Sequence, residues 1–61
     1  MATQADLREK YRYTLHLLLK IKKANEGRDV AELQPAIEGV VALMDIADIE
    51  WVERVIGIKA I

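Results

Sequence analysis

The stretch from Met44 to Ile61, MDIADIEWVERVIGIKAI, carries apolar residues on two sides of any helix that it could form. At about 100° per residue, one side holds Ile49, Val52, Ile56 and Ala60, and the nearly opposite side holds Trp51, Val55 and Ile58. A helix that is apolar on two sides is normally covered on both. The rest of a short chain covers one side, so the sequence predicts that a second copy covers the other.

The small size of the chain favours the same conclusion. With 61 residues and no cysteine, it cannot use disulfides or thiolate zinc sites, and the single histidine, His16, cannot build a histidine-rich site. A core of fewer than roughly 70–80 residues rarely supplies more than about 3–5 kcal/mol. We therefore expect a homodimer. Its predicted interface consists of the apolar residues Ile49, Trp51, Val52, Val55, Ile56 and Ile58.

The N-terminal half has the pattern of one amphipathic helix, at about residues 4–25. Thr3 is positioned to cap its start, with Asp6 three residues later. A single apolar stripe runs at three- and four-residue steps through Leu7, Tyr11, Leu15 and Leu18. Gly27 suits the left-handed conformation that closes helices, so residues 26–34 are predicted to form a turn.

The C-terminal half predicts a helical segment at about residues 35–59. Pro35 suits an initial helical position, although a helix that starts near residue 30 and kinks at Pro35 is the alternative. Asp48 interrupts the apolar stripe, and burying its carboxylate is costly unless it is paired, so we expect a bend or break near residues 45–48. The other possibility at the end is a strand over RVIGIKAI, where apolar residues alternate.

These patterns together predict an all-α fold in a single domain spanning residues 1–61. The chain is expected to form a helical hairpin or three short helices, and to assemble as a homodimeric helical bundle. Trp51 is the residue most expected at the dimer interface, because large aromatic side chains dominate contact energies.

Residues that could carry catalysis are scarce. The chain has no serine and no glycine-rich phosphate loop, and the acids Asp45, Asp48, Glu50 and Glu53 fit helix capping and solvation better than metal binding. We therefore expect no enzymatic activity, no cofactor and no metal. The predicted function is that of a small regulatory or adaptor protein acting through protein–protein interaction and self-association.

The charge distribution suggests an alternative function. Residues 1–28 carry a net charge of +4 and residues 29–61 a net charge of −5, so the two halves attract each other. The alternative is RNA or DNA binding through a basic face of the first helix, with contacts from Arg8, Arg12, Tyr13, Lys20 and Lys23.

The sequence has no signal-peptide pattern and no apolar run near the roughly 20 residues that span a bilayer. A cytoplasmic location is expected, and membrane binding is not, because the core needs the apolar stripe of the first helix.

Overall fold

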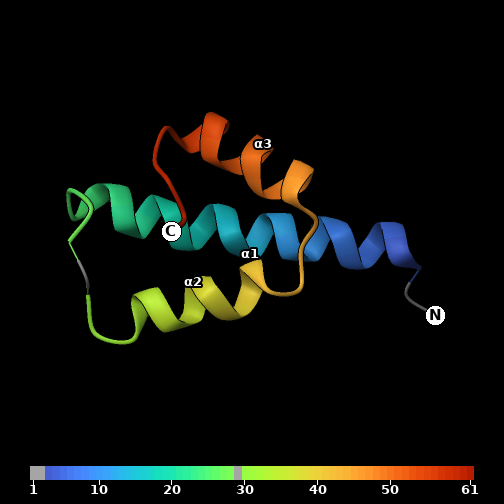
Figure 1. Ribbon diagram of the computed structural model, residues 1–61, viewed down its shortest axis with the longest axis horizontal. Helices are drawn as coiled ribbons and strands as arrows, with labels where there is room; N and C mark the ends of the chain where they lie inside the picture. The colour runs from blue at the N-terminus through green and yellow to red at the C-terminus, as the bar shows by residue number, and fades with distance from the viewer. Residues whose placement is uncertain (1–2, 29) are drawn as a thin grey trace.

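The computed structural model describes residues 3–28 and 30–61 and contains three helices within them. They are α1 (Gln4–Ala24), α2 (Leu33–Val41) and α3 (Ile46–Ile56). The long α1 runs through the middle of the molecule, α2 returns along one side of it, and α3 follows its direction along the other (Figure 1). Both shorter helices pack on α1 and barely touch each other. The prediction of an all-helical fold is confirmed in its three-helix form.

Helix α1 begins and ends at the signals that the sequence contains. The Thr3 hydroxyl accepts a hydrogen bond from the Asp6 N–H, and the Asp6 carboxylate accepts one from the Thr3 N–H, each at 3.2 Å. This capping box satisfies two N–H groups that have no partner within the helix. At the other end, Gly27 takes a φ of 79° and donates its N–H to the Lys22 carbonyl at 2.9 Å.

Helix α2 begins two residues earlier than the predicted start at Pro35. Pro35 is the third residue of α2, within the first turn, where a backbone N–H has no helical acceptor to lose. The chain enters the helix through Glu32, whose φ of 63° is left-handed. Residue 29, in the predicted turn over residues 26–34, lies outside the described residues.

Helix α3 is shorter than the predicted segment. The helical conformation ends at Val41 and begins again at Ile46. Helix α3 then ends at Ile56 rather than near residue 59. Gly57 ends it with a φ of 85° and donates its N–H to the Glu53 carbonyl at 2.7 Å. Residues 57–61 are neither helix nor strand, so Ile58 does not continue the helical face of Trp51 and Val55.

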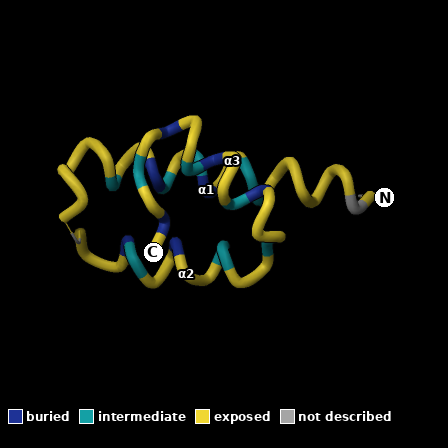
Figure 2. Tube along the Cα trace, turned by 45° about the horizontal axis from the view of Figure 1, so that its top comes forward, coloured by how far each residue is buried: buried dark blue, intermediate teal, exposed yellow. Residues whose placement is uncertain are grey.

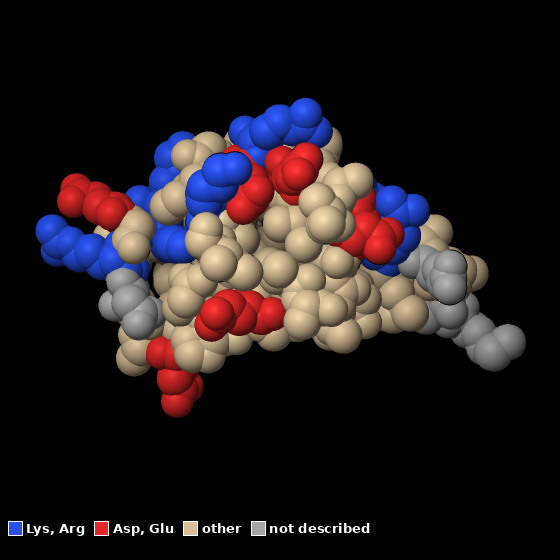
Figure 3. All heavy atoms as spheres, viewed as in Figure 1, with Lys and Arg blue, Asp and Glu red and all other residues tan. Residues whose placement is uncertain are grey.

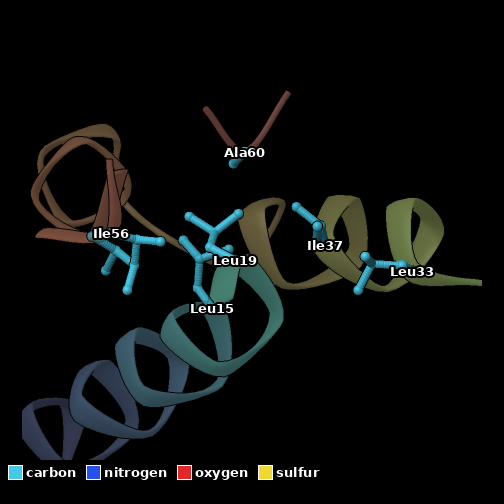
Figure 4. Packing of buried hydrophobic residues seen from close by; sticks show 7 residues of the cluster. Leu15, Leu19, Leu33, Ile37, Ile56 and Ala60 are labelled. Atoms are coloured by element: carbon cyan, nitrogen blue, oxygen red, sulfur yellow. The ribbon is translucent and has the colours of Figure 1, made fainter. Parts of the chain in front are cut away.

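The core lies where the three helices face one another, as the buried positions in Figure 2 show. Among the residues that the structure describes, it contains seven buried apolar residues, which are Leu15, Leu19, Leu33, Ile37, Val52, Ile56 and Ala60. Figure 4 shows Leu15 and Leu19 of α1 between Ile56 of α3 and Ile37 of α2. Four of the seven, Leu15, Leu19, Ile37 and Val52, are fully buried.

The last residues of the chain connect the two short helices. Ala60 is 1% exposed and lies over Leu19 (Figure 4). Its N–H donates to the Glu53 carboxylate of α3 at 2.7 Å, and its carbonyl accepts from the Gln34 side-chain amide of α2 at 2.9 Å. The Lys22 ammonium of α1 also donates to this carbonyl at 3.3 Å. Residue 60 is therefore bonded to all three helices.

Candidate protein interface

The six residues predicted at a self-association interface have different environments in the structure. Helix α3 packs on α1 through positions spaced by four residues, and this places Val52 and Ile56 in the core of the single chain. Ile49 and Ile58 are partly buried against that core. Trp51 and Val55 remain 45% and 53% exposed. Of the two apolar sides, the one with Val52 and Ile56 is therefore covered by the chain itself.

Helix α1 also has a second apolar face that the sequence analysis did not separate from its core stripe. Tyr13, Leu17 and Ile21 are 58%, 45% and 46% exposed. They follow one another at four-residue steps, so they form one row on the helix, away from the buried Leu15 and Leu19. The sequence contains this row as a second series of apolar residues at helical spacing, but it does not show which of the two series is buried.

The exposed residues of the two helices meet beside His16. One open hollow is lined by Glu9, Arg12, Tyr13, His16 and Trp51. A second hollow includes His16, Lys20 and Val55. Tyr13 of α1 therefore lines one hollow with Trp51, Val55 lines the neighbouring hollow, and Leu17 and Ile21 continue the row of Tyr13 along α1. We call these five exposed residues the α1–α3 surface.

Arg8, the first of the predicted nucleic-acid contacts, binds a carboxylate of its own chain. Its Nε donates to Oδ2 of Asp48 at 3.1 Å, and its Nη2 donates to Oδ1 at 3.2 Å. This bidentate ion pair explains how the carboxylate of Asp48 can be buried, at 7% exposure, on the core side of α3. The hydrogen bond from the Arg8 guanidinium, followed by its charge, holds the pKa of Asp48 below that of an ordinary aspartate, although burial acts in the opposite direction.

Two more of the predicted basic contacts are also engaged within the chain. The guanidinium of Arg12 lies 5.4 Å from the centre of the Trp51 ring, within the range of a cation–π contact. The Lys23 ammonium donates to the Ile56 carbonyl at 2.6 Å, at the C-terminal end of α3. Tyr13 and Lys20 are exposed. The five residues therefore do not form a row of free basic groups.

The charges visible on one face of the molecule are unevenly distributed over the helices. In the view of Figure 3, acidic and basic groups lie side by side over α3, basic groups gather over the C-terminal end of α1, and the side of α2 shows acidic groups alone. Among the described residues, no cluster of three or more histidine, aspartate or glutamate side chains could hold a metal ion. No helix in that part of the chain has the length and apolar composition needed to cross a membrane.

The α1–α3 surface offers large exposed apolar side chains on two helices. The chain matches no protein-family model, no curated protein and no solved structure.

Proposed function

We propose that this chain is a small, non-enzymatic regulatory or adaptor protein that acts by protein–protein contact and self-associates through the α1–α3 surface. The observation that carries the proposal is the exposure of five large apolar residues on α1 and α3, against seven apolar residues buried in the core among those that the structure describes. Aromatic residues are enriched at interfaces, and a surface with Trp51 and Tyr13 has the corresponding composition.

The total exposed area supports the same proposal. The chain exposes 4435 Å². A compact monomer of 6.9 kDa exposes about 4000 Å². The excess of roughly 400 Å² is about half of what one partner contributes to a standard interface.

The test is the mass in solution, measured by light scattering over micromolar concentrations. We expect the parent protein to give about twice 6.9 kDa. Leu17→Glu places a charge in the middle of the α1–α3 surface and should return the mass to that of one chain. Ile46→Glu is the matched control, because Ile46 is an exposed apolar residue of α3 outside that surface. A parent protein that stays monomeric throughout would contradict the proposed self-association.

The alternative function, RNA or DNA binding through the basic face of α1, has less support. Lys20 and Tyr13 favour it, because both are exposed and Tyr13 lines the same hollow as Arg12. Arg8 and Lys23 count against it, because each already donates to an acceptor within the chain. If this alternative holds, the parent protein binds a polynucleotide column at low salt and Lys20→Glu elutes at lower salt. A parent protein that passes through the column at low salt excludes it.

A further inference from the structure

The segment that follows α3, residues 57–61, bridges α3 and α2 through the two bonds of Ala60. From the way this segment is fastened, we infer that it is a strap, which opens about Gly57 while the three helices stay folded, and that Lys22 of α1 holds it closed. None of its residues belongs to the α1–α3 surface, so the strap does not depend on the proposed self-association.

The strap is fastened by side chains of the helices. The Lys22 ammonium donates to the carbonyls of Lys59 and Ala60, at 3.1 Å and 3.3 Å. Its third donor bonds to the side-chain oxygen of Gln34 at 3.2 Å, so all three N–H groups of the ammonium have acceptors. The Gln34 amide donates in turn to the Ala60 carbonyl at 2.9 Å. Lys22 therefore bonds both to the strap and to the side chain that holds the strap on α2.

Apolar burial contributes little to holding the strap in place. Ala60 is 1% exposed and lies over Leu19 (Figure 4), but its side chain adds a single methyl group to the core. Ile58 is partly buried, and Ile61 is largely exposed. The helices bury whole leucine, isoleucine and valine side chains, which remove much more apolar surface from water. The strap should therefore open at a lower free energy than the helices unfold.

Gly57 is positioned to act as the hinge of the strap. Glycine reaches backbone conformations that other residues avoid, and Gly57 already has a φ of 85°. Rotation about its ψ moves residues 58–61 and leaves the bond from its N–H to the Glu53 carbonyl in place. Since α2 and α3 barely touch each other, the open strap uncovers Leu19 on the side where Ala60 lies. The strap thus controls access to this part of the core.

Hydrogen exchange of backbone amides, followed by NMR on the parent protein, tests whether the strap opens separately. The Ala60 N–H reports on the strap and the Leu19 N–H on the helices. The Ala60 amide should be at least about tenfold less protected than the Leu19 amide. Low urea should leave its exchange unchanged, because opening a short segment exposes little surface. Equal protection with an equal response to urea would mean that the strap opens only when the whole chain unfolds, which overturns the inference.

Lys22→Met tests the role of Lys22, because it removes the ammonium and keeps an unbranched apolar side chain. Exchange at Ala60 should become about tenfold faster, since bonds from a charged donor are lost, whereas exchange at Leu19 should change little. Lys20→Met is the matched control, because Lys20 lies on the same helix but lines the hollow beside His16. An unchanged rate at Ala60, an equal acceleration at Leu19, or the same effect in Lys20→Met would contradict the role of Lys22. Circular dichroism of both variants checks that the helices are retained.

Discussion

Leu19→Ala is the substitution that should remove most of the stability of this fold. Leu19 is fully buried and lies where α1, α2, α3 and Ala60 meet (Figure 4). Truncating a buried leucine to alanine costs about 3–5 kcal/mol, because the lost burial adds to the cavity that is left. A chain of this size has about 3–5 kcal/mol in total. The variant should therefore be largely unfolded in water, as measured by circular dichroism.

Leu17→Ala is the matched control, since it makes the same chemical change two residues away on the same helix. Leu17 is 45% exposed, so its truncation should cost about 1 kcal/mol or less in a single chain. Urea unfolding at low protein concentration compares the two variants. At high concentration Leu17→Ala should lose in addition the stability that self-association provides. If Leu19→Ala cost no more than Leu17→Ala at low concentration, the packing described for α1 would be wrong.

Glycine substitutions and acid unfolding give two further predictions. Gly57→Ala should destabilise the protein by about 1–2 kcal/mol, because the φ of Gly57 is 85° and an added Cβ would lie 3.2 Å from the Lys23 ammonium. Gly39→Ala, inside α2 and with open space around it, should instead stabilise it by about 0.5–1 kcal/mol; equal effects in urea unfolding would refute this distinction. For Asp48 the folded pKa is lowered by Arg8, so its contribution is present at neutral pH and is lost as the pH falls below about 4. Asp48→Asn should remove that part of the pH dependence, and an unchanged acid profile would contradict the role of the ion pair.

The helices could be predicted from the sequence because their signals are local. The capping residues Thr3 and Asp6, and the three- and four-residue spacing of the apolar residues, act over a single turn or two. The end of α3 also had a local signal in Gly57. The apolar periodicity continues through Ile58, however, and the preference of glycine for a left-handed helix end prevails over it in the structure.

The environment of Asp48 and of the basic residues could not be predicted, because it depends on contacts across the fold. Asp48 is paired with Arg8, forty positions away, and Lys23 binds the carbonyl of Ile56. No local pattern in the sequence indicates either of these two contacts. Of the candidate interface, Trp51 and Val55 are exposed, whereas Val52 and Ile56 are buried because the core of the single chain uses that side of α3. The exposed row of Leu17 and Ile21 could have been separated only by knowing which side of α1 receives α2 and α3.

The bonds made by Ala60 also bear on when the fold can form during translation. A chain is made from its N-terminus, so α1 and α2 exist before α3 has been synthesised. Until residue 60 has been synthesised, Leu19 lacks the residue that lies over it (Figure 4), and α2 and α3 lack the group that bonds to both. Closure of the core then requires a contact between segments nearly forty residues apart, which is the slow kind to form. The apolar residues of α1 therefore remain accessible until residue 60 has been synthesised.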